Sequence, residues 1–255
     1  MALKMESEQY VNAIVDVGQV LLASGAEIYR VEDTVERLAL AAGFARAEVF
    51  ATPTGLFATL VSRDGPVYSR VRRIRRVEAN LARIAALNQL SPEFAAQPRL
   101  QTLTTALTAC EEMQSYSPLW ITAAGALGSA AFAVIFGGTW PETVLAGLNG
   151  ALAMLVMLWA RWRRVPPFLA STSAAFAAAA LGVVGTRFLT ASMDIVILAG
   201  VMVLVPGITI TTSLRDLLSG ELVSGVARAA EAGVTALAVA VGVAAVLGIM
   251  GVIPW

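Results

Sequence analysis

The chain has 255 residues, of which 57% are hydrophobic and 14% are charged, and its 18 basic residues balance its 18 acidic ones. Soluble domains are about 45–50% apolar and about 25% charged, so this composition indicates a membrane protein. The neutral balance argues against nucleic acid as a partner, because phosphate binding needs a basic excess. One cysteine and no histidine exclude a disulfide within this chain and any catalysis by its own histidines.

Charge is distributed unevenly along the sequence. Residues 1–115 hold 12 of the 18 Lys and Arg and 13 of the 18 Asp and Glu, and long uncharged runs follow. We therefore expect a membrane protein of two domains. The first is a cytoplasmic soluble α+β domain over residues 1–116, and the second is a five-helix transmembrane domain over residues 117–255.

The soluble domain begins with two predicted helices. Apolar residues recur at helical spacing within residues 11–22 and again within residues 28–38. Ser24 and Glu27 have the spacing of a capping box, in which each side chain binds a free backbone N–H at the start of a helix. Gly43 is well placed to end the second helix.

Three short β-rich runs come next: AEVFAT (47–52), LFATLVS (56–62) and VYSRVRRI (67–74). Two more helical patterns follow, over roughly 77–89 and 98–115. The domain is therefore predicted to have helices flanking a small sheet.

The second domain contains five runs that are long and apolar enough to cross a bilayer, which needs about 20 residues. Within the first of them, Gly125 and Ser129 form a small-xxx-small pattern that favours close helix packing. The predicted spans are about 119–138, 143–160, 168–190, 193–213 and 230–253.

The placement of Lys and Arg predicts the orientation, because cytoplasmic loops carry the excess of basic residues. RWRR at 161–164, Arg215 and Arg228 fall on the same side as the N-terminal domain, and only Arg187 falls on the other side. We therefore expect a cytoplasmic N-terminus and a C-terminus outside.

The fourth span ends in an unusual stretch, LVPGITITTSLRDLLSG at 204–220. Pro206 lacks the N–H that a helix needs, and Gly207 follows it. Two interpretations are open: a broken helix that lines a substrate pathway, and a simple proline kink at the cytoplasmic end of the span. In the first interpretation the hydrogen-bonding candidates are Thr209, Thr211 and Thr212.

Charged residues follow this stretch. Asp216, Glu221 and Glu231 are candidates for binding a proton or a substrate ammonium. Arg215 and Arg228 could attract a carboxylate, and Arg215 is the candidate for the substrate carboxylate. The alternative is that these charges are solvated in a cytoplasmic loop. Leucines and valines within 214–226 form an amphipathic stripe, either an interfacial helix or a re-entrant piece that lines a cavity.

Two polar residues of the spans are further candidates. Asn149 lies in the middle of the second span between two glycines, either as an interhelical hydrogen bond or as a site residue. Asp194 opens the fourth span at the outer face, either as an interfacial residue or as an exit-side gate.

No nucleotide fingerprint of the GxGxxG or GxxxxGK[ST] type occurs, so ATP-driven transport by this chain alone is not expected. We predict no catalytic residue, cofactor or metal, and therefore no enzyme. Two competing hypotheses are a membrane-anchored hydrolase that works through Asp or Glu, and a regulatory or scaffold subunit of a transporter.

Two long stretches carry a resemblance to a known family. LLASGAEIYRVEDTVERLALAAG followed by TPTGLF, and later PGITITTSLRDLLSGELVSGVARAAEA, resemble the two signatures of the threonine/serine exporter family. The positions that match these signatures are Gly25, Glu27, Arg30, Pro206, Gly207, Arg215, Asp216, Gly220, Gly225 and Glu231.

The resemblance implies secondary export of small metabolites across the bacterial cytoplasmic (inner) membrane. Longer family members have about ten spans, so a five-span chain resembles the larger subunit of a split, two-component type that is similar to an exporter linked to succinate. It implies threonine/serine-type amino acids or a dicarboxylate as substrate, and a smaller membrane subunit that supplies the remaining spans. We further expect coupling to the proton gradient and an oligomer in the lipid bilayer.

Overall fold

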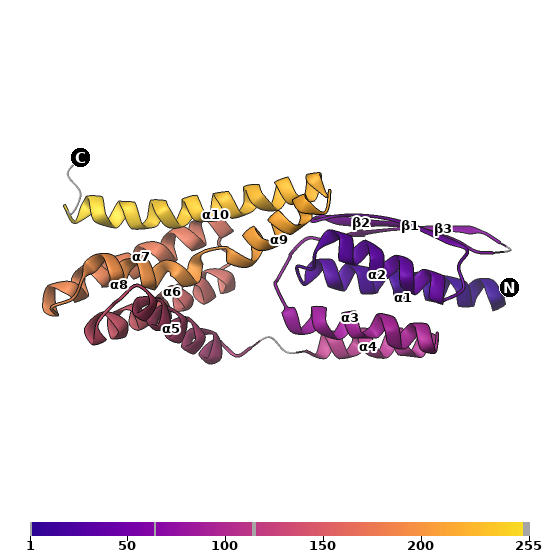
Figure 1. Ribbon diagram of the computed structural model, residues 1–255, viewed down its shortest axis with the longest axis horizontal. Helices are drawn as coiled ribbons and strands as arrows, with labels where there is room; N and C mark the ends of the chain where they lie inside the picture. The colour runs from indigo at the N-terminus through magenta and orange to yellow at the C-terminus, as the bar shows by residue number, and fades with distance from the viewer. Residues whose placement is uncertain (1, 64, 114–115, 252–255) are drawn as a thin grey trace. The chain divides into compact units, whose positions relative to one another are not determined.

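The computed structural model describes residues 2–63, 65–113 and 116–251 (Figure 1). The chain divides into two compact units. The first contains Met1–Gln114 together with Ile208–Ala229, and the second contains Ser115–Gly207 together with Ala230–Trp255. The segment Ile208–Ala229 thus packs with the N-terminal part of the chain, although it lies among the membrane segments in sequence.

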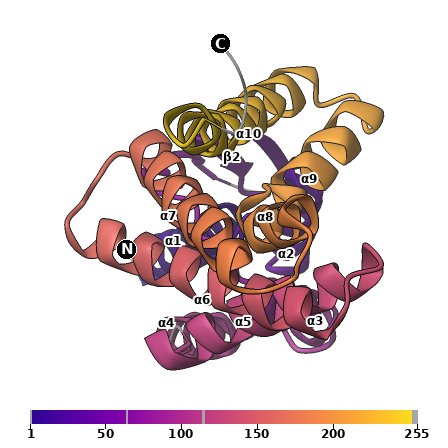
Figure 2. The ribbon, with the colours of Figure 1, turned by 90° about the vertical axis from the view of Figure 1, so that its left-hand side faces the viewer.

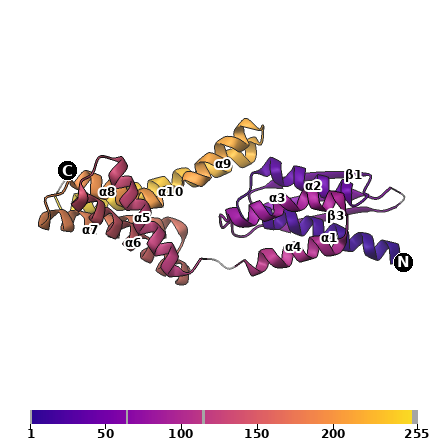
Figure 3. The same cartoon turned by 60° about the horizontal axis from the view of Figure 1, so that its bottom comes forward.

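The first unit is built in layers, with a sheet, a middle layer of two helices and an outer layer of two more (Figures 1 and 3). Helices α1 and α2 lie between the sheet and the outer pair. The predicted order of two helices, three short strands and two more helices is confirmed. The elements are α1 (Ala2–Ala23), α2 (Ile28–Ala41), β1 (Arg46–Thr52), β2 (Gly55–Val61), β3 (Val67–Arg73), α3 (Leu81–Ala96) and α4 (Leu100–Glu112).

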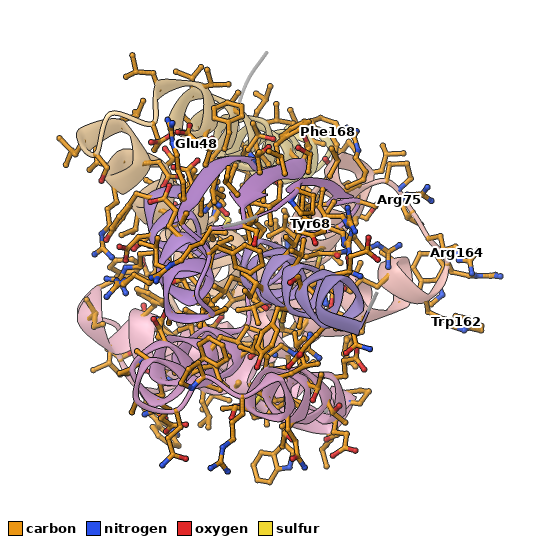
Figure 4. The ribbon with its side chains drawn as sticks, turned by 90° about the vertical axis from the view of Figure 1, so that its right-hand side faces the viewer. Glu48, Tyr68, Arg75, Trp162, Arg164 and Phe168 are labelled. Atoms are coloured by element: carbon orange, nitrogen blue, oxygen red, sulfur yellow. The ribbon has the colours of Figure 1, made fainter. Side chains whose placement is uncertain are left out.

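The sheet is antiparallel in the order β1-β2-β3 and is covered by helices on one face. Leu56 and Leu60 of β2 point to that face and are fully buried in the core. Tyr68 of β3 is buried there too and meets Phe44 edge to face (Figure 4). The opposite face carries exposed side chains such as Phe57, so the helices cover one face of the sheet rather than flanking both.

The second unit is a helical bundle (Figure 2). Its helices are rich in small residues, which allow close approach: a Cβ on Gly150 would lie 2.5 Å from the carbonyl oxygen of Gly125. The small-xxx-small pattern therefore packs inside this bundle. The elements of this unit are α5 (Pro118–Ile135), α6 (Trp140–Trp162), α7 (Pro167–Phe188), α8 (Met193–Val201), the 3₁₀ turn η1 (Met202–Leu204) and the part of α10 (Leu222–Ile249) from Ala230 onward. Helix α9 (Gly207–Leu218), from Ile208 onward, and the start of α10 belong to the first unit.

Four helices of the described residues, α5, α6, α7 and α10, are long and apolar enough to cross a membrane. A fifth span is counted if the pair Met193–Leu204 and Gly207–Leu218 is taken as one broken span. The predicted fold, a helix-and-sheet domain followed by membrane helices, is confirmed.

One predicted span needs correction. The fourth, 193–213, is not one helix, because the 3₁₀ turn and Pro206 interrupt it before α9 begins. The helix that contains the predicted fifth span already begins at Leu222, and its residues before Ala230 pack with the first unit. Residues 252 and 253 of the predicted fifth span lie outside the described residues.

Candidate functional site

The corner between α1 and α2 forms the base of the site. Helix α1 ends at Ala23, and Gly25 takes the left-handed conformation at φ +82°, which glycine adopts without strain. The N–H of Ala26 then donates to the carbonyl of Leu21. This local geometry turns the chain so that the carbonyl of Ala26 and the N–H of Ile28 are available to other partners.

The predicted capping box of Ser24 and Glu27 is wrong. Glu27 itself is the N-cap residue of α2, and its side chain makes no capping hydrogen bond in the described part of the chain. Ser24 still belongs to the turn that ends α1, and its buried hydroxyl has no partner among the described residues. The spacing fits a capping box with Ser24 as the N-cap, but α2 begins three residues later, with Glu27 as its N-cap.

Asp216 of α9 supplies the missing cap. Its Oδ1 accepts a hydrogen bond from the N–H of Ile28 at 3.1 Å, and the residue is fully buried. A carboxylate at this place also meets the positive end of the α2 dipole. A residue 188 positions away in sequence therefore completes the first turn of α2.

Arg228, on the first part of α10, contacts both the backbone of this corner and the carboxylate of Asp216. Its Nη2 donates to the carbonyl of Ala26 at 2.8 Å, and its Nε lies 3.4 Å from Oδ2 of Asp216. Arg228 is 6% exposed, so the two charges are paired away from water. A buried pair of this kind is sensitive to the loss of either partner.

Glu27 lies between two further arginines. Its carboxylate pairs with Arg215 of α9 and with Arg30, whose Nε lies 2.5 Å from Oε2 of Glu27. Glu27 is 8% exposed, whereas the side chains of the two arginines are about half exposed. We call Glu27, Arg30, Arg215, Asp216 and Arg228 the motif cluster. Three arginines and two acids give it a formal charge of +1.

An acidic edge lies beside this cluster in the same unit. Glu32 of α2 accepts a hydrogen bond from the N–H of Ala51 at 2.7 Å. Burial raises the pKa of Glu32 above its usual value, the hydrogen bond opposes that shift, and the charges of Glu221 and Glu36 add to it. Glu221, a predicted site residue, thus lies near a carboxyl that folding shifts toward the protonated form.

Comparison with known proteins decides the family. A family model described as "Putative threonine/serine exporter" (ThrE) matches residues 12–250. The chain belongs to the ThrE family. The two stretches that meet in the motif cluster, 24–30 and 215–228, both lie within the matched residues.

Two relatives are similar to this ThrE chain at low identity. A "Probable threonine/serine exporter" of Mycobacterium tuberculosis is 26% identical over 234 residues, which cover 89% of this chain and 44% of that protein. A "Probable succinate transporter subunit YjjP" of Escherichia coli is 25% identical over 245 residues, 94% of each chain. The ThrE chain thus spans less than half of the mycobacterial protein and nearly all of the E. coli one. No solved structure matches the chain.

The structure separates the predicted site residues of the ThrE chain into two groups. Arg215 and Asp216 join the motif cluster, and the hydroxyl of Thr212 on the same helix donates to the carbonyl of Ile208 at 2.9 Å. The first unit contains Thr209, Thr211, Thr212, Arg215, Asp216 and Glu221, whereas the second contains Asn149, Asp194, Pro206, Gly207 and Glu231. Asp194 and Glu231 are exposed on their helices.

Asn149 is one of the buried polar residues of the bundle and makes the interhelical hydrogen bond that was one of its two interpretations. Its Nδ2 donates to the carbonyl of Val196 in α8 at 3.3 Å, while its Oδ1 has no partner among the described residues. A Cβ on Gly200 would lie 2.6 Å from Cβ of Asn149, so α6 and α8 approach closely at this point. Ser129 donates to the carbonyl of Gly200 at 3.3 Å and joins α5 to the same place.

Sequence reasoning missed three residues that the structure makes prominent. Glu27 was assigned to capping, Arg228 to a solvated loop or a carboxylate contact, and Glu142 was not singled out. Glu142 is buried and its Oε1 accepts from the N–H of Ser192 at 2.6 Å, while its Oε2 accepts from the hydroxyl of Thr139 at 2.7 Å. The family signature already included Glu27, and the spacing from Thr139 to Glu142 is a capping-box pattern that could have identified the latter.

Proposed function

We propose that this chain is a subunit of a secondary transporter that exports small metabolites, either threonine/serine-type amino acids or a dicarboxylate such as succinate. One observation carries the proposal: the two signature stretches of the ThrE family meet in a buried cluster of paired charges. The names of the two relatives, an exporter of threonine and serine and a succinate transporter subunit, support the same substrate classes.

In this proposal Arg215 and Arg30 receive the substrate carboxylate. Both guanidinium groups are half exposed, and both share the single carboxylate of Glu27. The motif cluster has a formal charge of +1, so one more carboxylate can be accommodated without an excess of negative charge. A substrate carboxylate would then compete with Glu27 for its two arginines.

Proton coupling is assigned to Asp216 in the proposal. Protonation removes its charge and weakens its attraction to Arg228, while the neutral carboxyl keeps an oxygen that accepts from the N–H of Ile28. The cap of α2 and the ion pair can therefore be changed separately. Such a step loosens the contact of α10 with the corner and leaves α2 intact.

The membrane arrangement completes the proposal. The soluble domain, residues 1–116, lies in the cytoplasm of a bacterial cell, and the C-terminus lies outside the cytoplasmic membrane. A smaller membrane subunit supplies further spans and forms an oligomer with this chain, as the word "subunit" in the name of the E. coli relative suggests.

The outer face of the 208–229 segment suits such a partner or lipid. Its polar residues Ser213, Asp216, Ser224 and Arg228 are buried, whereas its large apolar side chains are exposed, the reverse of a helix on a water-soluble surface. The exposed side chains are Ile208, Ile210, Leu214, Leu218, Leu222, Val223 and Val226.

The remaining predicted residues keep their roles as proposals. Thr209, Thr211, Thr212, Glu221 and Glu231 are assigned to the cytoplasm-facing part of the pathway, which begins at the helix break of Pro206 and Gly207. Asn149 is assigned to the part of the pathway within the membrane, and Asp194 to a gate on the exit side.

A counterflow assay tests the proposed function. Proteoliposomes hold the chain together with the small membrane protein that copurifies with it, are loaded with unlabelled L-serine, L-threonine or succinate, and receive a trace of the labelled compound outside. We expect accumulation of the label for at least one of the three, faster with an imposed pH gradient. No accumulation above protein-free liposomes for all three would overturn the proposal.

A further inference from the structure

A polar pocket opens between α2 and α3 in the first unit, away from the ion pair of Asp216 and Arg228. Its volume is about 350 Å³. The two helices run side by side (Figure 3). Helix α2 contributes Tyr29, Arg30, Asp33 and Arg37, and α3 contributes Asn88 and Ser91.

The α2 wall presents two cations and one anion. The Nε of Arg30 donates to the hydroxyl of Tyr29 at 3.0 Å, and this bond raises the pKa of Arg30 further, so the guanidinium stays charged. Since this contact and the one to Glu27 both use Nε, the terminal nitrogens of Arg30 have no partner among the described residues and can meet a ligand. Arg37 pairs with Asp33 one turn earlier on the exposed side of the helix.

The α3 wall adds uncharged donors and acceptors. Pro92 lies inside α3 and has no N–H, so the carbonyl of Asn88 loses its usual helical donor. That carbonyl, the amide of Asn88 and the hydroxyl of Ser91 belong to residues that line the pocket. The hydroxyl-bearing Thr34 of α2, which is buried, lies on the opposite wall.

We propose that this pocket binds a small α-amino acid. The carboxylate is held by Arg30 and Arg37, the ammonium by Asp33 and the carbonyl of Asn88, and a short polar side chain lies toward Ser91 and Thr34. Ligand sites have volumes of about 300–1,000 Å³, so this pocket is at the small end and fits a compact ligand. The pairing of two arginines with one aspartate favours a zwitterion over a dication or an apolar ligand.

Arg30 connects the pocket to the motif cluster, because it also pairs with Glu27, which pairs with Arg215. A bound carboxylate competes for Arg30 and leaves Glu27 more strongly paired with Arg215. The pocket therefore senses a small amino acid and adjusts the cluster. This regulatory consequence rests on the proposed function, whereas binding in the pocket does not.

Isothermal titration calorimetry of the full chain in detergent micelles tests the binding site, with L-threonine, L-serine and succinate as probes. We expect heat of binding for the two amino acids and weaker binding for succinate, which has no ammonium for Asp33. Arg37→Gln should weaken amino-acid binding roughly tenfold or more, since it removes a hydrogen bond to a charged group. Arg46→Gln is the matched control, an exposed arginine of the same unit that pairs with Glu48, and it should leave binding unchanged.

Asp33→Asn tests the ammonium contact separately from the carboxylate contact. It removes the charged partner of the ammonium, so it should reduce the preference for amino acids over succinate. Thermal unfolding of each variant shows that it is folded. The proposal is overturned if neither amino acid binds, if Arg37→Gln binds as the unchanged chain does, or if only Arg215→Gln abolishes binding. Because no flux is measured, a failed counterflow assay leaves this result standing.

Discussion

The contact between Asp216 and Arg228 can be measured as a coupling free energy. We consider Asp216→Asn, Arg228→Gln and the double variant. Asn at position 216 keeps an oxygen that accepts from the N–H of Ile28, so the change removes the charge and preserves the cap. Asp216→Ala removes both the charge and the cap.

The burial of the two groups sets the magnitude. Asp216 is fully buried and Arg228 is 6% exposed, and removal of one partner from a buried pair costs about 3–5 kcal/mol because the other charge is left unpaired. The carbonyl of Ala26 retains a bond from Arg228, which moderates this cost. We therefore expect about 2–4 kcal/mol for each single variant and a coupling of about 1–3 kcal/mol. Asp216→Ala should cost about 1 kcal/mol more than Asp216→Asn, the value of a helix cap.

Hydrogen exchange read by mass spectrometry supplies the assay, because it reports the opening free energy of the first turn of α2 locally. The exposed pair Asp33 and Arg37, at i,i+4 on the same helix, is the matched control and should couple by about 0.3–0.5 kcal/mol. If the coupling of Asp216 and Arg228 is no larger than this control value, the two residues do not form the buried link described above.

Three further predictions concern other parts of the chain. Burial raises the pKa of Glu32, so the stability that its protonated form contributes is present below its usual pKa and is lost as pH rises through the raised value. Glu32→Gln keeps an acceptor for the N–H of Ala51 and stays neutral. In urea unfolding, this variant should be more stable than the unchanged chain at neutral pH and equally stable in acid. Glu142→Ala removes three hydrogen bonds that join two loops of the bundle and should lower the midpoint of thermal unfolding in micelles. Gly200→Ala places a Cβ 2.6 Å from Cβ of Asn149 and should cost about 1–3 kcal/mol in the same measurement.

Each of these has a control in the chain. Glu48→Gln, at an exposed acid of β1, should show no stability gain at neutral pH, and an equal gain would contradict the account of Glu32. Glu111→Ala, at an exposed position near the end of α4, should cost much less than Glu142→Ala. Gly128→Ala would meet only an ordinary contact of 3.5 Å with Val203, so a cost as large as that of Gly200→Ala would refute the packing argument.

Local patterns in the sequence predict the elements well. Alternation and turn residues place the strands to within one residue, and the positive φ of Gly43 confirms it as the residue that ends α2. These features depend on neighbours in sequence, so they can be read from a short window.

The motif cluster depends on a contact that no short window contains. Ile28 and Asp216 are 188 residues apart, and the pattern at Ser24 and Glu27 suggested a local cap that the corner cannot form. Sequence reasoning selected Arg215 and Asp216 as functional candidates but had no means of finding that their partners lie in the N-terminal part of the chain. The packing of the helix after Pro206 also depends on distant contacts. Pro206 indicates that the fourth span breaks, but a local pattern does not show with which part of the chain the next helix packs.

Counterflow by Asp216→Asn tests the central claim most directly, namely that the motif cluster takes part in transport. The variant is compared with Glu48→Gln, which changes an exposed acid on β1, at equal amounts of folded protein in proteoliposomes. The account predicts that Asp216→Asn loses at least about tenfold in counterflow rate and its response to a pH gradient, while Glu48→Gln keeps both. An unchanged rate and an unchanged pH response in Asp216→Asn would contradict it.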